Sequence, residues 1–214
     1  MFIESIESRR LLSAALADDG TLTVTGDASN NVIQVFAHER LGKVLVLEAT
    51  RTVSPTGRPV ISNVSRSMFD LSKVTSVVVN AGEGNDIVSL SSAIPGAING
   101  DAGNDLLRGG RGDDEISGGA GNDIVYGGGG DDDIDGGEGN DYLIGGAGAD
   151  NLSGGAGDDR ILAVDLKSTD SISGGDGDDK AFVDDGDTVA DDVETVRKLR
   201  RAPQAAGGGT RVAR

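Results

Sequence analysis

Aspartate residues recur at a fixed interval in the middle of the chain, and each follows a short run rich in glycine. From residue 109 to residue 162 the sequence reads GGRGDDEIS, GGAGNDIVY, GGGGDDDID, GGEGNDYLI, GGAGADNLS and GGAGDDRIL, so six nonapeptides follow one another without interruption. All six have the form G-G-x-G-x-D-x-U-x, in which U is a large aliphatic residue. The repeat therefore supplies one carboxylate and several glycine carbonyl groups at a regular spacing.

The glycines and acidic residues of this repeat suit a turn lined with oxygen atoms. Glycine adopts positive φ angles without steric cost, so a glycine-rich turn can reverse the chain and direct several carbonyl groups to one point. At the fifth position, Asn104, Asn122 and Asn140 are expected to tolerate such angles next best. Calcium takes six to eight oxygen ligands at about 2.3 to 2.6 Å, whereas magnesium needs a stricter octahedron and zinc prefers His or Cys. The chain has one His and no Cys, so the repeat predicts calcium binding.

The repeat continues outward in altered form. The segments 81–89 (AGEGNDIVS), 100–108 (GDAGNDLLR) and 174–182 (GGDGDDKAF) each depart from the pattern at one position. A three-residue strand followed by a six-residue glycine turn cannot pair with its immediate neighbour, so successive strands are expected on opposite walls of a flattened helix. Two nonapeptides, or 18 residues, then form one coil, and the central residue of each strand points inward. The predicted inward residues are Val88, Ile98, Leu107, Ile116, Val125, Ile134, Leu143, Leu152, Ile161, Ile172 and Ala181.

The nonapeptide resembles the RTX, or hemolysin-type, calcium-binding repeat, and the resemblance covers about half of the chain. It implies an all-β fold, a right-handed parallel β-roll (β-solenoid), here with a β-rich N-terminal capping region. In that family each ion lies between two turns on the same edge that are two repeats, or 18 residues, apart. It takes the carbonyls of the second and fourth positions and the Asp of one turn, together with the carbonyls of the first and third positions and the Asp of the next.

Carried over position by position, the resemblance implies about five strong calcium sites. They lie between Asp105 and Asp123, Asp123 and Asp141, and Asp141 and Asp159 on one edge, and between Asp114 and Asp132, and Asp132 and Asp150, on the other. The implied carbonyl donors include Gly110, Gly112, Gly118, Gly119, Gly121, Gly127, Gly128, Gly130, Gly136, Gly137, Gly139, Gly145 and Gly154, with Glu138 beside Gly136. Asp86 stands 19 residues before Asp105 and Asp179 stands 20 after Asp159, so one or two weaker terminal sites require the chain to absorb extra residues.

Residues 18–80 lack the full repeat but contain short alternating runs such as residues 21–25 (TLTVT) and 32–35 (VIQV). Residues 26–34 (GDASNNVIQ) have the shape of an eroded nonapeptide, with Asn31 where Asp would stand. This pattern predicts β-structure that caps or continues the roll. The roll itself is predicted over residues 81–187.

The two ends of the chain differ in composition from the repeat region. Residues 1–17 are predicted to be a leader, because SIESRRLLSAALADDG resembles the Arg-then-Leu-Leu-Ser-Ala leader of extracellular proteins of planctomycete-type bacteria. An amphipathic first helix or a cap is the alternative. The basic segment 188–214 is predicted to be mostly disordered, with a short helix over 191–201 as a further alternative.

The net charge of −17 is concentrated with the glycines, since residues 81–187 hold 25 acidic and 5 basic residues. This distribution excludes a general nucleic-acid binder, which would carry a basic face. No apolar run approaches the roughly 20 residues needed to span a bilayer, so no transmembrane segment is expected.

The composition also bears on function. Burial of a few aliphatic side chains cannot offset the entropy of ordering the repeats, so folding is expected to require calcium. Calcium modules of this kind bind at about 0.1 to 1 mM, which favours an extracellular or cell-surface location in a bacterium. The chain has no H-E-x-x-H or G-x-S-x-G motif, and no catalysis is expected. We therefore expect a structural or adhesive calcium-binding module, with cell-surface glycan or matrix as a partner. The alternative is an auxiliary, non-catalytic module of an extracellular enzyme such as a protease or a polysaccharide-modifying enzyme.

Overall fold

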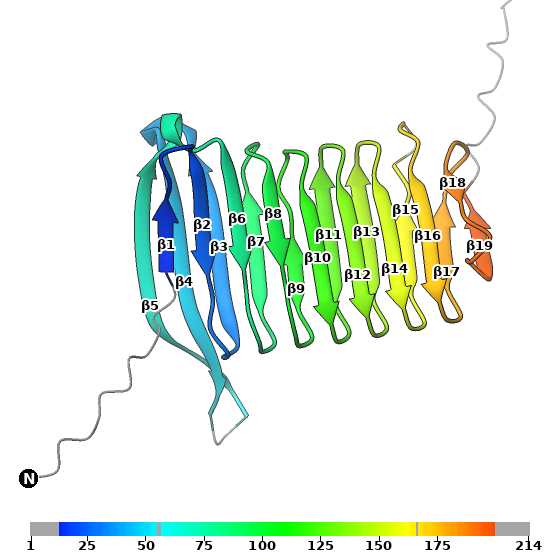
Figure 1. Ribbon diagram of the computed structural model, residues 1–214, viewed down its shortest axis with the longest axis horizontal. Coiled ribbons are helices and arrows are strands. Elements are labelled where there is room, and N and C mark those ends of the chain that lie inside the picture. Colours follow the sequence, from blue (N-terminus) through cyan, green and yellow to red (C-terminus); the bar gives the residue numbers. More distant parts are fainter. Residues whose placement is uncertain (1–12, 55–56, 166, 200–214) are drawn as a thin grey trace, which may run out of the picture.

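Two β-sheets face each other along the long axis of the molecule and form a flattened solenoid (Figure 1). This computed structural model describes residues 13–54, 57–165 and 167–199. Through the repeat region, successive strands alternate between the two sheets, so the chain winds around a shared interior. The predicted all-β fold with a parallel β-roll is confirmed. In the described part of the chain, no helix is long and apolar enough to cross a membrane.

The sheets are called sheet A and sheet B. In order across sheet A lie β1 (Ser13–Leu16), β2 (Thr21–Thr25), β6 (Ser76–Asn80), β8 (Gly96–Asn99), β10 (Glu115–Ala120), β12 (Asp133–Glu138), β14 (Asn151–Ala156), β16 (Ser171–Asp176) and β18 (Thr188–Val189). In order across sheet B lie β19 (Thr195–Lys198), β17 (Lys180–Val183), β15 (Arg160–Ala163), β13 (Tyr142–Ala147), β11 (Ile124–Gly129), β9 (Leu106–Arg108), β7 (Ile87–Ser91), β3 (Asn31–His38), β4 (Lys43–Val53) and β5 (Pro59–Asp70). Two short 3₁₀ turns, η1 (Glu39–Leu41) and η2 (Leu71–Lys73), follow β3 and β5.

Each strand of the repeat pairs in parallel with the strand one coil later. Ile116 lies beside Ile134 in sheet A, and Val125 lies beside Leu143 in sheet B. Both pairs are two nonapeptides apart. The register therefore confirms that one coil contains two repeats.

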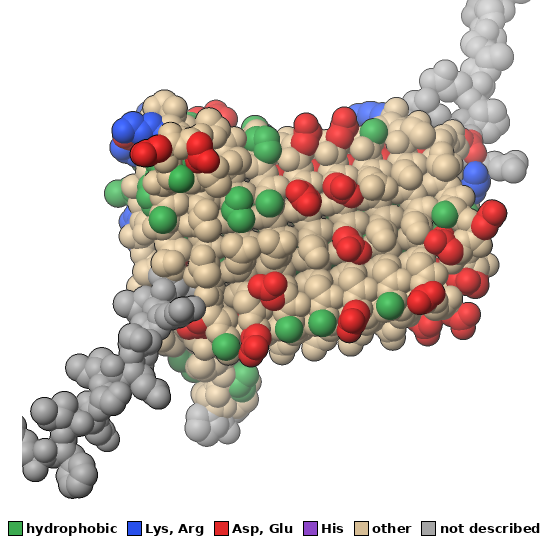
Figure 2. Space-filling view, in the orientation of Figure 1, with side chains coloured by type: hydrophobic (Ala, Val, Ile, Leu, Met, Phe, Trp, Pro, Cys, Tyr) green, Lys and Arg blue, Asp and Glu red, His purple; other side chains and the backbone are tan. Residues whose placement is uncertain are grey.

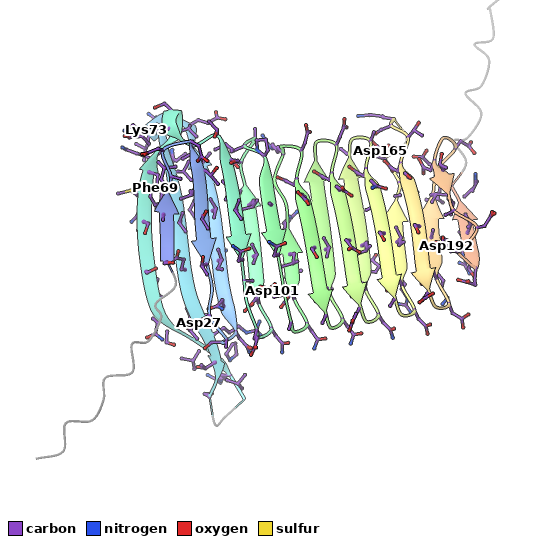
Figure 3. All side chains as sticks on the ribbon, in the orientation of Figure 1. Asp27, Phe69, Lys73, Asp101, Asp165 and Asp192 are labelled. Carbon is purple, nitrogen blue, oxygen red and sulfur yellow. The ribbon has the colours of Figure 1, made fainter. Side chains whose placement is uncertain are left out.

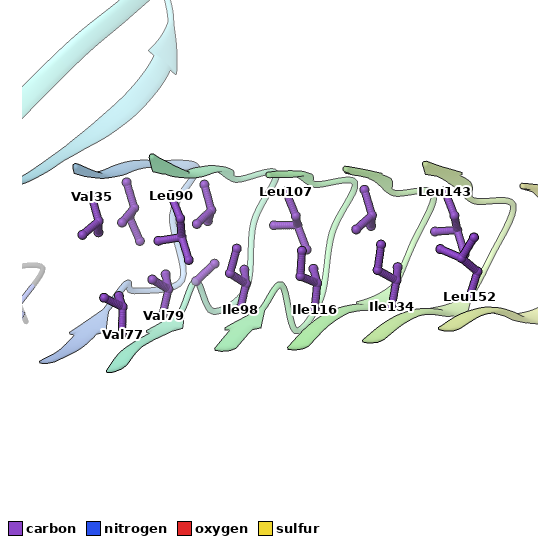
Figure 4. Close-up of a cluster of buried hydrophobic side chains, with 14 of the residues drawn as sticks. Val35, Val77, Val79, Leu90, Ile98, Leu107, Ile116, Ile134, Leu143 and Leu152 are labelled. Atoms are coloured by element: carbon purple, nitrogen blue, oxygen red, sulfur yellow. The ribbon is translucent and has the colours of Figure 1, made fainter. Parts of the chain in front are cut away.

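Aliphatic side chains from the two sheets meet in a continuous row between them (Figure 4). Val35, Leu90 and Leu107 project from one wall, and Ile98 and Ile116 project from the other. All eleven residues predicted to point inward are buried, with exposed fractions of 2% or less. The core is one side chain deep on each wall, as the period-two pattern of a strand requires.

The N-terminal region joins the solenoid and also closes its end. β2 pairs in parallel with β6, and β3 pairs in parallel with β7, so the parallel sheets begin before residue 81. The hairpin of β4 and β5 then extends sheet B with antiparallel strands, and β1 extends sheet A in the same way. β1 takes its residues from the segment predicted to be a leader, and residues 1–12 of that segment lie outside the described residues.

The alternative of a short helix over 191–201 is wrong for its described part, and residues 200–214 of the predicted disordered segment lie outside the described residues. Residues 188–189 and 195–198 form β18 and β19, which continue the two sheets. Thr195 and Val196 are β-branched and favour strand, and the parallel pairing of β19 with β17 provides the hydrogen-bond partners that a helix would provide internally. Val193 is buried at the end of the core.

The repeat strands are longer than three residues, because the Gly-Gly-x segment is also paired with the next coil. β10 and β12 each span six residues, and Gly119 lies beside Gly137. Gly119 and Gly121 have φ angles of 107° and 133°, and a methyl group on Gly121 would overlap the carbonyl oxygen of Gly103 in the preceding coil. At such positions glycine is required both by the backbone angle and by the close stacking of coils.

The expectation that Asn at the fifth position adopts positive φ is wrong. Among the described residues, the non-glycine residues with positive φ are Asn63 and Asp101. In the repeat 100–108 Asp101 replaces the second glycine, so an L-residue adopts the positive φ angle at this position. The Asn residues have a different role, which is described with the site.

We predict that Leu107→Ala lowers the free energy of unfolding by about 2 to 5 kcal/mol, because it leaves a cavity in a fully buried position. Leu106→Ala, at the adjacent residue, is the matched control. Its side chain is 37% exposed on the outer face, and its loss should cost less than about 1 kcal/mol. Urea unfolding in saturating calcium measures both, and equal losses would contradict the inward and outward assignment.

Candidate metal centre

The aspartates of the repeat form one column along each edge of the roll. Turns that lead from sheet A to sheet B lie on the first edge, and turns that lead back lie on the second edge. Figure 3 shows these edges, with Asp27 and Asp101 on the first and Asp165 on the second. The first column is Asp86, Asp105, Asp123, Asp141, Asp159 and Asp179, and the second is Asp114, Asp132, Asp150, Asp170 and Asp187. All eleven are buried, with exposed fractions of 8% or less.

Within a column, each aspartate is hydrogen-bonded to the backbone of the coil before it. The N–H of Asp105 donates to Oδ1 of Asp123 at 2.7 Å, and the N–H of Asp123 donates to Oδ1 of Asp141 at 2.8 Å. On the second edge the N–H of Asp132 donates to Oδ1 of Asp150 at 3.0 Å. One carboxylate oxygen of each residue is therefore fixed in the wall of the turn, and the orientation of the second oxygen is fixed with it.

The second oxygen has no hydrogen-bond donor in most of these residues. Buried Oδ2 atoms without a partner occur at Asp86, Asp105, Asp123, Asp132, Asp141, Asp150, Asp159 and Asp179. A buried carboxylate oxygen without a donor is unfavourable, because its hydration is lost and nothing replaces it. Asp114 differs, since Gly110 N–H donates to its Oδ2 at 2.6 Å.

Several of these Oδ2 atoms lie close to the first glycine of their own turn. A carbonyl oxygen of the next coil lies close to the same glycine. A methyl group on Gly136 would lie 2.5 Å from Asp141 Oδ2 and 2.5 Å from the carbonyl oxygen of Gly154. Gly118 and Gly127 have the same surroundings, with Oδ2 of Asp123 or Asp132 on one side and a first-position carbonyl of the next coil on the other. An Asp oxygen and a first-position carbonyl oxygen therefore converge between two coils, in the arrangement that the resemblance implies.

Carbonyls of the second and third positions also take part in hydrogen bonds between coils. Ala120 N–H donates to the carbonyl of Asp101 at 2.8 Å, and Gly121 N–H donates to the carbonyl of Glu138 at 2.7 Å. A carbonyl oxygen has two lone pairs, so such a bond leaves one for another ligand. The structure thus brings the predicted carboxylates and first-position glycines together, and the other carbonyl donors remain predictions.

The donor set suits a hard cation. In the described part of the chain, no three acidic or His side chains converge on one point. An ion between two coils would thus be held by carboxylates of the column and by backbone carbonyls, all of them oxygen donors. This composition fits calcium, and it does not provide the nitrogen or sulfur ligands that zinc prefers.

Burial raises the pKa of the column carboxyls. The pKa rises to about 7 at Asp132 and to about 6 at Asp141 and Asp150, mainly because burial penalises the charged form and further because neighbouring carboxylates repel it. The pKa is also raised to about 7 at Asp86, to about 6 at Asp105, Asp159 and Asp170, and to a smaller extent at Asp114, Asp123 and Asp179. In each case burial is the largest cause.

The columns extend further than the repeat pattern. On the second edge the N–H of Asp150 donates to Oδ1 of Asp170, and the N–H of Asp170 donates to Oδ1 of Asp187, although the glycines of these turns are lost. On the first edge Asn31 N–H donates to Asp86, and Asp179 N–H donates to Glu194. Sequence reasoning missed Asp187 because its turn lacks the G-G-x-G run, and it missed Glu194 because this residue lies beyond the repeats.

A second ladder, on the outside, explains the Asn residues at the fifth position. The N–H of Asn122 donates to Oδ1 of Asn104 at 2.7 Å, and the N–H of Asn140 donates to Oδ1 of Asn122 at 2.7 Å. These bonds run from a later coil to an earlier one, opposite to the bonds of the buried columns. The Asn side chains therefore hold adjacent coils together from the solvent side.

Comparison with known proteins agrees with this geometry. Residues 99–134, 126–161 and 167–189 match the family model of the RTX calcium-binding nonapeptide repeat (4 copies). The matched residues include the columns from Asp105 to Asp159, together with Asp170, Asp179 and Asp187, whereas Asp86 lies before them. The chain matches none of the curated proteins.

We predict that Asp132→Asn weakens calcium binding at the two sites that share this residue by at least about tenfold, because it removes a charged ligand oxygen. Asn keeps an Oδ1 that can accept the N–H of Asp114, so the ladder survives. Asp131→Asn removes the same charge one residue earlier at an exposed position, and it should change the affinity by less than about twofold. Calorimetric titration compares them, and equal effects would contradict the assignment of Asp132.

We predict that in calcium-free buffer the protein becomes more stable as the pH falls from about 7 to about 4.5. The column carboxyls have folded pKa values of about 6 to 7 at several positions, above an unfolded value of about 3.9, so the folded state binds more protons in this range. Their stabilising contribution is complete below about pH 4 and is lost as the pH rises through 6 to 7. The far-UV circular dichroism signal for strand in calcium-free buffer at several pH values tests this, and a signal that grows as the pH rises would contradict it.

Proposed function

Since residues 99–161 and 167–189 carry RTX calcium-binding nonapeptide repeats, we propose that this chain is a secreted or cell-surface module whose folding is coupled to calcium binding. Calcium binding by the β-roll follows from the repeats themselves. We further propose that calcium binding is coupled to folding, that the chain lies outside the cell or on its surface, and that it has a structural or adhesive role. The RTX β-roll is typically a structural, non-catalytic module, which agrees with a role in binding.

One observation carries the coupling: the columns hold buried carboxylate oxygens that no protein group satisfies. Adjacent coils of a parallel sheet are about 4.8 Å apart, so successive carboxylates are close together. At an effective dielectric constant near 20, two such charges repel by roughly 3 kcal/mol. Several such pairs together are comparable with the whole stability of a domain, so the charged, ion-free roll is expected to be unstable.

The residues that would hold calcium follow from the same geometry. Asp123 and Asp141 on the first edge, and Asp132 on the second, present Oδ2 into the space between coils beside first-position carbonyls. Bound calcium supplies positive charge between the carboxylates and replaces their lost hydration. The chain contributes the fixed orientation of each oxygen through the N–H···Oδ1 ladder of the folded roll.

A location outside the cytoplasm is supported by the expected affinity. Extracellular calcium modules have dissociation constants of about 10⁻⁴ to 10⁻³ M, far above cytosolic calcium levels. A chain of this kind would remain unfolded inside the cell and fold after export. A rigid, acidic rod at the cell surface would then serve as a spacer or as a binding surface for glycan or matrix.

We predict that the far-UV circular dichroism signal for strand is largely absent in chelator and appears as calcium is added, with a midpoint in the range of about 0.1 to 1 mM. Calorimetry on the same sample should give about five strong sites, one for each implied pair between Asp105 and Asp159. Magnesium at the same concentration is the control and should not restore the signal. A complete strand signal in chelator at neutral pH would refute the coupling.

A further inference from the structure

The two outer faces of the roll differ in chemistry. The residues that point outward from sheet A are mostly polar or acidic, such as Glu115 and Asp133, which are neighbours across β10 and β12. Figure 2 shows the side of the molecule on which β1 lies, where red acidic side chains are spread over the face and gather at the end opposite β1, while green apolar ones are small and scattered. The outward residues of sheet B include Leu106, Ile124 and Tyr142, which are neighbours in register and 37 to 40% exposed.

The second outward row of sheet B places aromatic and basic side chains together. Arg108 lies beside Tyr126, and Tyr126 lies beside Ile144 in the next coil. The guanidinium carbon of Arg108 is 5.7 Å from the centre of the Tyr126 ring. Tyr142 stands diagonally across from Tyr126 in the adjacent strand, so two tyrosine rings share one face.

A hollow adjoins this row where β3, β7 and β9 end at the second edge. It has a volume of about 670 Å³, and Arg108 lies both in its wall and on the outer face of sheet B. Arg40, from the turn after β3, and Arg111, from the turn after β9, also line it, together with His38 and Glu39. Stacking of strands that are distant in sequence therefore gathers three arginine residues around one cavity.

Among the described residues, no ion pair neutralises this positive cluster. Across the described residues, the ion pair within 4.0 Å joins Lys43 and Asp70, and it involves none of the three arginines. Glu39 is the acidic residue among those that line the hollow. A repeat region with 25 acidic and 5 basic residues thus places two of those five bases, Arg108 and Arg111, at one site.

The position of the hollow is also distinctive along the second edge. The column of carboxylates begins at Asp114, and the turn one coil earlier, residues 92–95, contains no acidic residue. In this turn Ser92 accepts the N–H of Arg111 through its carbonyl at 2.7 Å, which fixes the backbone of Arg111 against the wall of the hollow. Where the cation-binding column stops, the chain presents arginines instead.

We propose that this hollow binds a carboxylate or sulfate group of an acidic polysaccharide, whose chain runs past Arg108 and Tyr126 and places a sugar ring on the exposed side chain of Tyr142. Guanidinium groups bind such oxyanions through paired N–H donors, and the exposed faces of tyrosine rings provide flat apolar area with a polar rim. A net charge of −17 disfavours an anionic membrane or nucleic acid, which would meet repulsion over the rest of the surface. A flexible polysaccharide that contacts the protein only at the hollow and on the outer face of sheet B, where Leu106, Ile124 and Tyr142 lie, avoids most of that repulsion.

This inference rests on the proposed function, because the hollow exists only when the coils of β3, β7 and β9 are stacked. The test therefore uses the full chain in saturating calcium, with folding checked on every sample by circular dichroism. The probes are dextran sulfate, polygalacturonate and neutral dextran of matched length, titrated by calorimetry. Dextran and dextran sulfate share a backbone, so they separate the contribution of the anionic group from that of the sugar.

At least one of the two acidic polysaccharides should bind and neutral dextran should not. Arg108→Gln combined with Arg111→Gln should weaken binding by at least about tenfold, because two charge-assisted contacts are lost. Arg66→Gln, on β5 and outside the hollow, is the matched control and should leave the affinity within about twofold. Tyr142→Ala, at an exposed position, should weaken binding of the polymer and leave the fold intact.

Three results would overturn the inference and leave the proposed function standing, provided that calcium still induces the folded signal. The first is no binding of either acidic polysaccharide by the folded protein. The second is equal affinity for the double arginine variant and the Arg66→Gln control. The third is self-association of the chain, seen by sedimentation, that depends on Arg108 and Arg111 while no polysaccharide binds. Failure of calcium to induce folding would instead refute the proposed function itself.

Discussion

The structure depends on a stack of carboxylates whose charges the protein itself does not satisfy. Each Asp of the columns accepts one hydrogen bond from the previous coil, and most of them keep a second buried oxygen without a donor. The aliphatic row inside the roll is only one side chain deep on each wall, so it offers limited burial to balance this repulsion. The same feature that opposes folding without a cation provides the ligand oxygens in its presence. Stability and binding are therefore two aspects of one arrangement.

Much of this arrangement could be predicted from the sequence because it is periodic. The nine-residue spacing determined which residues point inward, as Leu107 and Ile116 show, and which aspartates share an edge, as Asp123 and Asp141 show. The predicted strands of three residues were too short. Gly119 pairs with Gly137 of the next coil, and such a contact between coils cannot be recognised from the local pattern of hydrophobic residues. The role of Asn122 was also misjudged, because its acceptor role depends on a neighbour 18 residues away and not on its own backbone angle.

Parts without a period could not be predicted in the same way. Asp187 joins the second column through the pairing of β18 with β16, and the G-G-x-G run that would mark it is absent from its turn. The hairpin of β4 and β5 could be recognised as β-structure, but its antiparallel addition to sheet B follows from the free edge of β3. The hollow beside Arg40 and Arg108 likewise arises from stacking of β3, β7 and β9, which lie in separate parts of the chain.

Because successive repeat strands alternate between the two sheets, an even and an odd number of inserted repeats have different effects on the roll. Corresponding residues of two successive nonapeptides lie in sheet A and in sheet B. Their surroundings differ only in the edge of the roll on which the following turn lies. Insertion or loss of two nonapeptides would preserve every column. Insertion of a single one would move all later turns to the opposite edge, so that Glu194 would end the second column and Asp187 the first, and the outer faces of the two sheets would be exchanged beyond that point. A roll of this kind can change its length during evolution only in even numbers of repeats, unless its ends and its faces change with it.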